Sequence, residues 1–341
     1  MSQNDRASKD DLIVIAGAGG FIAGALAKYF QDKGFNRIRA IDKKPLPEWY
    51  QQVLGVENLC LDLSDSDNCE QACEGAVEVY NLAADMGGMG FIERFRIQCL
   101  RSVLINTHLI EAAYRAGAKR YFFSSSACAY NTTLQEDPDV RALKESDAYP
   151  AMSERGYGWE KLISEMFCEE YWHERGMKTF IARFHNVYGP NGTWDGGREK
   201  APAAICRKVI EAKDSELGKI DIWGSGDQTR SFMYIDDCTL GIDKIMHCDE
   251  LIAKAINLGS SELIAINKLA DMASGIGGAK LEYEHDLDAP QGVAGRNSDN
   301  TMIKDILGWE PDIPFSEGLN KTYTWIEKQY FDRKAGKRTV S

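Results

Sequence analysis

The stretch LIVIAGAGGFIAGALA, from Leu12 to Ala27, holds sixteen consecutive uncharged residues near the start of the chain. It is too short and too rich in glycine for a membrane span, which needs about 20 apolar residues. A signal peptide would need a basic flank, but Arg6 and Lys9 are outnumbered by acidic neighbours. We therefore interpret the stretch as a buried strand (12–16), a glycine turn and a helix (21–33).

Strands and helices continue to alternate after this unit. Apolar runs predict strands at 38–41, 78–81, 120–124 and 179–183, with helices at 102–116 and 157–176 between them. This alternation predicts an α/β fold with a doubly wound parallel sheet of the Rossmann type. Past residue 186, glycine-rich loops and short elements predict a smaller α/β substrate-binding domain.

The length of 341 residues fits two domains at about 150 residues each. The Rossmann domain is predicted to comprise residues 11–186 plus about 231–260. The substrate-binding domain is predicted to comprise residues 187–230 plus about 261–333. Residues 1–10 and 334–341 are polar and are predicted to be flexible tails.

Composition excludes several classes of protein. The chain carries 40 basic and 52 acidic residues, a net charge of −12, which argues against a nucleic-acid partner. The nine cysteines form no C-x-x-C pair and predict reduced thiols, hence a cytoplasmic protein. Five histidines without an H-E-x-x-H motif predict no metal site. With no membrane span, a soluble enzyme with a small-molecule ligand is expected.

The glycine turn has the spacing of a dinucleotide-binding loop. Gly17 permits the tight turn, Gly20 lets the backbone approach a pyrophosphate, and Ala23 lets the helix pack on the strand. Asp42 ends the next strand, where a carboxylate binds the ribose hydroxyls of NAD and repels the extra phosphate of NADP. Lys43 and Lys44 leave the exclusion of NADP open. The predicted NAD contacts at the turn are Gly17, Gly20, Phe21 and Ile22.

Further cofactor contacts are predicted where other strands end. Asp62 and Leu63 follow the third strand, where an adenine edge can be held. Ala83 belongs to the run Asn81-Leu-Ala-Ala84 after the fourth strand and is assigned to the cofactor side. An ordinary polar strand end is nearly as good an interpretation of Asp62.

A serine, a tyrosine and a lysine form a candidate catalytic set. Tyr157 and Lys161 are four residues apart, on one face of a helix. The ammonium group is expected to lower the pKa of the phenol, making Tyr157 a general base for a substrate hydroxyl. Ser126 ends a strand upstream and can share the same substrate oxygen.

These features together resemble the extended short-chain dehydrogenase/reductase superfamily over about residues 11–330. Asn81-Leu-Ala-Ala84, Asn106 and Arg230-x-Phe232 also look like motifs of that superfamily. The resemblance implies an NAD-dependent enzyme in which Ser126, Tyr157 and Lys161 are catalytic.

Five further blocks are similar to the GDP-mannose 3,5-epimerase family within that superfamily. They are residues 84–91, 126–128, 183–190, 196–204 and 295–300. The resemblance implies a homodimer that acts on a GDP-sugar, inverting C3 and C5 through a 4-keto intermediate. It also implies that Cys128 and Lys200 are the acid–base pair. Their ordinary pKa values, near 8.5 and 10.4, can be brought towards neutral by a neighbouring cation and by desolvation, respectively.

The resemblance also implies a set of substrate contacts. Lys208, Arg230 and Arg296 are basic positions suited to a diphosphate. The loop that holds Gly87, Gly88 and Met89 lets backbone lie close to the sugar. Cys128 and Lys200 are expected to contact the sugar, and Asn186 is expected to contact the diphosphate side or to order the loop. His185 is as readily a packed histidine as a contact.

The residues leave alternatives open. A related GDP-sugar, or inversion at one centre only, fits the chain where it departs from the family, as at Tyr149 and after Cys128. Another nucleotide-sugar enzyme of the superfamily, a 4-epimerase or a 4,6-dehydratase, is a second hypothesis. A dehydratase would want a carboxylate near Ser126, and the next two residues supply none. A non-catalytic nucleotide-sensing protein is a third, although such proteins usually lose the tyrosine and lysine.

Overall fold

The computed structural model describes residues 6–290, 292–337 and 339, and within them seven strands form one parallel sheet. In their order across the sheet, these strands are β11 (Ala255–Leu258), β6 (Lys178–Phe184), β5 (Arg120–Ser126), β4 (Ala76–Asn81), β1 (Leu12–Ala16), β2 (Ile38–Asp42) and β3 (Glu57–Cys60). Every residue of β1 is buried. A strand buried in this way needs cover on both faces of the sheet.

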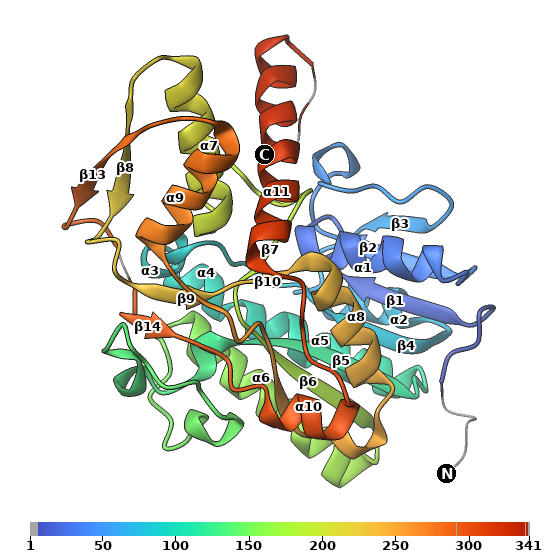
Figure 1. Cartoon of the computed structure of the whole chain (residues 1–341). Helices are drawn as coiled ribbons and strands as arrows, with labels where there is room; N and C mark the ends of the chain where they lie inside the picture. Colours follow the sequence, from blue (N-terminus) through green and yellow to red (C-terminus); the bar gives the residue numbers. More distant parts are fainter. Residues whose placement is uncertain (1–5, 291, 338, 340–341) are drawn as a thin grey trace.

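Helices cover the two faces of this sheet in two groups (Figure 1). On one face, α1 (Phe21–Asp32) and α8 (Ile235–Met246) pack on alternate residues of β1, such as Ile13 and Ile15. On the other face, Val14 packs with α2 (Ser66–Cys73), α5 (Ser102–Arg115) and α6 (Tyr157–Arg175). The sheet is therefore doubly wound, and the predicted fold class is confirmed.

The rest of the chain builds a smaller assembly beside the sheet. Its helices α7 (Ala201–Asp214), α9 (Ile266–Gly277) and α11 (Phe315–Lys334) lie together in Figure 1. Its short strands are β7 (Val187–Tyr188) paired with β10 (Met233–Tyr234), β8 (Lys219–Trp223) paired with β13 (Glu282–Asp286), and β12 (Leu263–Ala265), β9 (Thr229–Ser231) and β14 (Gly295–Arg296) in a third small sheet. The remaining helices are α3 (Met89–Arg94), α4 (Arg96–Leu100) and α10 (Thr301–Leu307).

The described residues also include short 3-10 helices. They are η2 (Leu46–Glu48), η3 (Ala127–Ala129), η4 (Thr132–Gln135), η5 (Glu145–Ala148) and η6 (Asp249–Leu251). No helix in the described ranges is both long and apolar enough to cross a membrane. All nine cysteines lie within those ranges as free thiols.

Candidate active site

The glycine turn after β1 is shaped by the end of β4. Gly17 has a φ of +85°, and a Cβ there would lie 2.9 Å from the Leu82 carbonyl oxygen and 3.0 Å from Ala83 N. Only glycine fits such a close approach without strain. The Gly20 N–H donates to Gly17 O at 2.9 Å, and α1 starts at Phe21 and Ile22. The first N–H groups of a helix have no partner within it, so this turn can bind phosphate.

The turn also depends on Gly19, which the spacing argument missed. A Cβ on Gly19 would lie 2.9 Å from Asp42 Cβ and Cγ and 2.8 Å from Trp49 Cδ1. The turn and the acidic end of β2 are therefore in contact. The signal that could have identified Gly19 is its place as the middle glycine in the run G-A-G-G.

Asp42 and its two following lysines are all engaged. The Asp42 carboxylate accepts a hydrogen bond from Lys44 N at 3.0 Å. Lys43 pairs with Asp85 at 2.6 Å, and the Lys44 ammonium lies 4.1 Å from the centre of the Tyr50 ring. Both lysines thus have partners of their own, and the Asp42 carboxylate is the group at the end of β2 that suits the hydroxyls of a ribose.

The residues predicted for the adenine side differ in environment. Asp62 is exposed and accepts hydrogen bonds from Ser64 N and Oγ at 2.9 and 2.8 Å. The backbone hydrogen bond from Ser64 lowers the pKa of Asp62. Leu63 is buried against the sheet. The contacts of Asp62 are those of a turn, and a cofactor role for either residue stays a prediction.

Ser126, Tyr157 and Lys161 come together where β5 ends against the start of α6. The Ser126 hydroxyl accepts a hydrogen bond from Cys128 N at 3.2 Å and is also a side-chain hydrogen-bond partner of Tyr157. The Lys161 ammonium lies 5.3 Å from the centre of the Tyr157 ring and 3.5 Å from Glu160 Oε2. Local spacing on the helix was enough to predict this arrangement.

The electrostatics of Tyr157 differ from the expectation. Burial raises the pKa of Tyr157 well above its ordinary value, nearby Cys128 and Glu160 add to the rise, and the hydrogen bond with Ser126 opposes it. The predicted lowering of this pKa is wrong because it counted Lys161 without Glu160 and without burial. The base role of Tyr157 stays a prediction.

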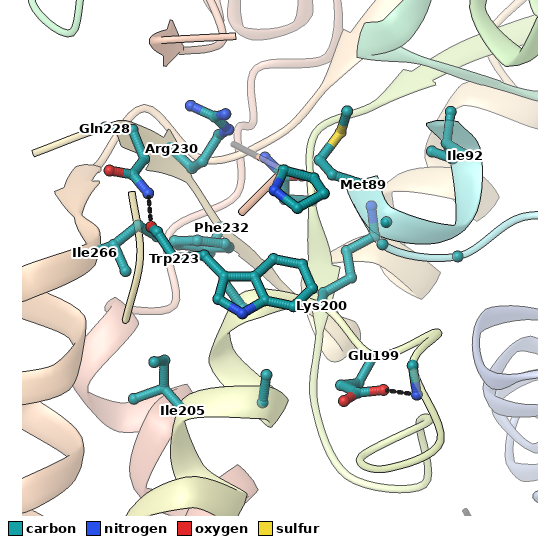
Figure 2. A pocket seen from close by; sticks show the side chains of 18 of the residues that line it. Met89, Ile92, Glu199, Lys200, Ile205, Trp223, Gln228, Arg230, Phe232 and Ile266 are labelled. Atoms are coloured by element: carbon teal, nitrogen blue, oxygen red, sulfur yellow. Dashed lines mark hydrogen bonds between the residues drawn. The ribbon is translucent and has the colours of Figure 1, made fainter. Parts of the chain in front are cut away.

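One cavity, here called the main cavity, lies beside this set and has a volume of about 260 Å³. In Figure 2, side chains from separate segments, including Met89, Lys200, Trp223 and Arg230, gather around it. The nine residues predicted to bind substrate all line it: Gly87, Gly88, Met89, Cys128, Asn186, Lys200, Lys208, Arg230 and Arg296. The structure thus brings together segments more than 200 residues apart in sequence.

The candidate acid–base pair has unequal surroundings. Burial raises the pKa of the Cys128 thiol, Glu154 adds to the rise, and Arg296 opposes it. The cation expected beside Cys128 is present, but it does not lower the pKa overall. Burial lowers the pKa of Lys200, and Arg296 and Arg230 lower it further. Lys200 therefore moves towards neutral as expected.

The three basic candidates are held in different ways. Arg296 donates to Gln135 Oε1 at 2.6 Å and to Cys128 Sγ at 3.4 Å, which places it next to the thiol. Arg230 donates to backbone carbonyl oxygens, including that of Thr229 at 2.8 Å, and burial lowers its pKa to about 9. Lys208 pairs with Asp221 at 2.7 Å. Arg296 thus lies at the Cys128 end of the main cavity.

Two loops close one side of the main cavity. Gly88 N donates to Arg198 O at 3.0 Å, and a Cβ on Gly88 would lie 2.6 Å from Glu199 O. On Gly87 it would lie 2.8 Å from Phe91 Cβ. Gly88 is therefore required by packing of the loop against residue 199, and Gly87 by packing against Phe91.

Residues that follow β6 turn out to be mainly structural. His185 is buried, with a ring nitrogen 2.9 Å from Asn257 Oδ1, and burial lowers its pKa to about 3. Asn257 also accepts a hydrogen bond from the Tyr130 hydroxyl at 2.6 Å. Asn186 has a φ of 39°, and its amide donates to Ser231 O at 3.0 Å. His185 is therefore a packed histidine.

Sequence reasoning missed Glu154, which lies next to the main cavity, and part of the lining of that cavity. Glu154 lies beside Cys128 and Arg296, with Oε2 3.5 Å from Arg296 Nη2. Further missed residues are Ile205, Trp223, Gln228, Phe232 and Ile266. Ile205 and Ile266 lie in helices and Trp223 ends a short strand, all outside any motif. Phe232 belongs to the Arg230-x-Phe232 motif but was not assigned to the substrate.

Comparison with known proteins agrees with this geometry. A model of the NAD dependent epimerase/dehydratase family matches residues 13–259. The chain belongs to this family. Among curated relatives, GDP-mannose 3,5-epimerase of Arabidopsis thaliana is 42% identical over 330 residues, covering 96% of this chain and 85% of the relative.

Solved structures support the fold of this NAD dependent epimerase/dehydratase family member. UDP-glucose 4-epimerase of Thermotoga maritima, solved with UDP-glucose, has a TM-score of 0.83 at 22% identity, covering 93% of this chain and 99% of that chain. UDP-glucuronic acid 4-epimerase of Bacillus cereus, solved with UDP-glucuronic acid and NAD, has a TM-score of 0.79 at 22% identity, with the same coverage.

The cofactor of the NAD dependent epimerase/dehydratase family is NAD, and this chain has the residues to hold it. The cradle at Gly17 and Gly19, which a Cβ would fill, leaves room for a pyrophosphate at the start of α1. Asp42 stands in contact with that cradle, where a ribose would bind.

Proposed function

We propose that this protein is an NAD-dependent isomerase that inverts C3 and C5 of GDP-mannose, or of a closely related GDP-sugar, through a 4-keto intermediate. The observation that carries the proposal is that Cys128 and Lys200 line one cavity beside Tyr157. The 42% identity to GDP-mannose 3,5-epimerase over 96% of the chain supports the same reaction.

The first step is oxidation at C4 of the sugar. NAD, held at the Gly17–Gly20 turn and Asp42, would supply the hydride acceptor for this carbon and the hydride for the final reduction. Tyr157 accepts the proton of the C4 hydroxyl, while Ser126 donates a hydrogen bond to the same oxygen. Tyr157 acts as a phenolate before it accepts this proton, and the Lys161 ammonium stabilises that phenolate.

The 4-keto group makes the hydrogens on C3 and C5 acidic. Inversion then needs one group that removes a proton from the ring carbon and another that returns a proton to the opposite face. Cys128 and Lys200 supply these two groups. The hydrogen bond from Arg296 to Cys128 Sγ stabilises a thiolate, and the lowered pKa of Lys200 favours proton exchange near neutral pH.

The remaining cavity residues bind the rest of the substrate. Arg230 and Lys208 face the diphosphate, Asn186 orders its side of the cavity, and Met89 and its glycine neighbours contact the sugar. This division follows the two predicted domains, with residues 11–186 and about 231–260 holding NAD, and residues 187–230 and about 261–333 holding the sugar nucleotide.

The functional unit is a cytoplasmic homodimer. Trp159, Ile163 and Met166 form an exposed apolar stripe on α6, and exposed Leu104 lies on the neighbouring helix α5. A second copy of this chain, related by a twofold axis, would bury this stripe against its own counterpart. Nine free thiols support a reducing compartment.

Incubation with GDP-mannose in deuterated water tests the reaction. The expected result is deuterium at C3 and C5 of the recovered sugar, seen by NMR and mass spectrometry. A 4-epimerase would invert C4 without such exchange, and a dehydratase would lose water at C5 and C6. Tightly bound NAD with no turnover of any nucleotide sugar would instead favour a sensing protein.

A further inference from the structure

Inversion at both centres creates a problem of proton supply, given the proposed function. In a sugar of the manno configuration, the hydrogens on C3 and C5 project from the same face of the ring. One base therefore removes both, and one acid on the other face supplies both replacements. After the first inversion the base is protonated and the acid is not, so the pair must be reset before the second.

Glu154 is placed to take part in this reset. Its Oε2 lies 3.5 Å from Arg296 Nη2, and Arg296 Nη1 donates to Cys128 Sγ at 3.4 Å. Glu154 N also donates to Cys128 O at 3.2 Å, and the Glu154 carboxylate is a side-chain hydrogen-bond partner of the thiol. A carboxylate thus touches the group that exchanges protons with the sugar.

The Glu154 carboxylate is held by a long ion pair. Its Oε2 and Arg296 Nη2 are both buried and 3.5 Å apart, and beyond this ion pair neither atom has a hydrogen-bond partner among the described residues. A carboxylate oxygen that accepts no hydrogen bond keeps a lone pair for a proton. An acid–base role is therefore better supported than a purely structural ion pair.

Glu154 also lines a second cavity, which has a volume of about 310 Å³. The second cavity is lined by Met89, Ile92, Glu93, Arg96, Thr132, Ser153, Glu154, Arg155, Gly292 and Val293. Met89 and Ile92 line the main cavity too, so the two cavities share a wall. A polar cavity of this size accommodates water.

We propose that Glu154 is a positioning and proton-relay residue that carries protons between Cys128 and the second cavity, resetting the Cys128–Lys200 pair after each inversion. The charged and titratable groups facing it are Cys128, Lys200, Arg230 and Arg296 on the main cavity side, and Glu93, Arg96 and Arg155 around the second cavity.

Each reset of the Cys128–Lys200 pair gives off one proton and takes up one. With Cys128 as the base, an inversion leaves a thiol and a neutral Lys200 amine. The Glu154 carboxylate takes the thiol proton, giving a thiolate and a carboxylic acid, and passes it to water in the second cavity. Lys200 takes one proton from water in the main cavity. With Lys200 as the base, every proton moves in the reverse direction through the same groups.

Comparison of wild type with Glu154→Gln and Glu154→Asp, each with GDP-mannose in deuterated water, tests the relay. Glu154→Gln keeps the shape but cannot carry a proton. Its steady-state rate is expected to fall about 100-fold or more, in the range of lost acid–base catalysis. In a single turnover, deuterium at the first inverted carbon should appear at the wild-type rate. Added formate, which enters the second cavity, should restore turnover, and Glu154→Asp should keep part of it.

The matched control is Glu250→Gln, the same change at an exposed glutamate of η6 that lines neither cavity. It should leave turnover and its pH profile unchanged. The relay is refuted if Glu154→Gln has the wild-type steady-state rate and pH profile, or if it slows the first inversion equally and formate has no effect. A wild-type protein that incorporates no deuterium overturns the proposed function, and the relay with it.

Discussion

Gly19 links the phosphate cradle to the carboxylate at the end of β2. In Gly19→Ala, the new methyl group would lie within 3 Å of Asp42 and Trp49, so these side chains must shift. Overpacking of this kind costs about 1–3 kcal/mol. Because Asp42 is displaced, we expect NAD to bind about ten-fold more weakly, which corresponds to about 1.4 kcal/mol. Titration with NAD, followed by fluorescence or calorimetry, measures this.

Gly275→Ala is the matched control for that substitution. Gly275 lies in α9, and a Cβ there would meet no described atom within 4 Å. Alanine gains up to about 1 kcal/mol over glycine inside a helix, so this variant should be at least as stable as wild type and bind NAD normally. Equal NAD affinity in the two variants would contradict the role given to Gly19.

For single residues, the sequence predicted which side chains lie together when they are a few residues apart at a regular spacing. Tyr157 and Lys161 are four residues apart on one helix, and the cradle follows from glycine spacing. Glu154 and Gln135 could not be predicted, because each meets Arg296 only after distant loops have folded together. The direction of the Tyr157 pKa was missed for the same reason, since burial depends on the whole neighbourhood.

A charged cluster ties α8 to the sheet. The His247 ring nitrogens lie 2.8 Å from Asp243 Oδ1 and 3.1 Å from Glu78 Oε1. Burial opposes a charge on His247, but these hydrogen bonds outweigh it and raise its pKa from 6.5 to about 9. A raised pKa stabilises the fold fully below the unfolded value, and this contribution is lost as the pH rises through the folded value.

The free energy of unfolding should therefore fall by about 3 kcal/mol between pH 6.5 and 9. Urea titrations across this range measure it. In His247→Gln the protein should be less stable at pH 6.5 and should lack this part of the pH dependence. A glutamine variant with the same decline as wild type would show that another group is responsible.

Most elements of the large sheet were predicted because a buried strand is a continuous apolar run. The predicted strand 12–16 is confirmed, and β5 extends two residues past the predicted end. The strands β8 and β13 lack this signal, since β8 alternates and β13 is largely exposed. Their pairing is set by tertiary contacts rather than by their own residues.

The proposed dimer makes a prediction for the whole molecule. Met166 on α6 is 52% exposed and is the most exposed of the three α6 residues in the apolar stripe. Met166→Asp would place a charge in a desolvated twofold interface, twice over, and should give a monomer in size-exclusion chromatography with light scattering.

Met152→Asp is its control, because Met152 is similarly exposed, at 54%, but lies in the loop before α6. It should leave the protein a dimer. A monomeric wild type, or dissociation by both variants, would argue against this interface. NAD binding should be retained in both, because neither methionine lies at the glycine turn.

The pairing of β11 with β6 also has a consequence for biosynthesis. These strands are neighbours in the sheet, yet residues 185–254 separate them in the chain. While the ribosome is still making that insertion, β6 presents an open edge that can pair with other nascent chains. Asn257 of β11 also anchors His185 and Tyr130, the latter two residues after Cys128. The reactive loop is thus locked only late in synthesis, so a truncated chain gains neither a protected sheet edge nor a finished catalytic centre.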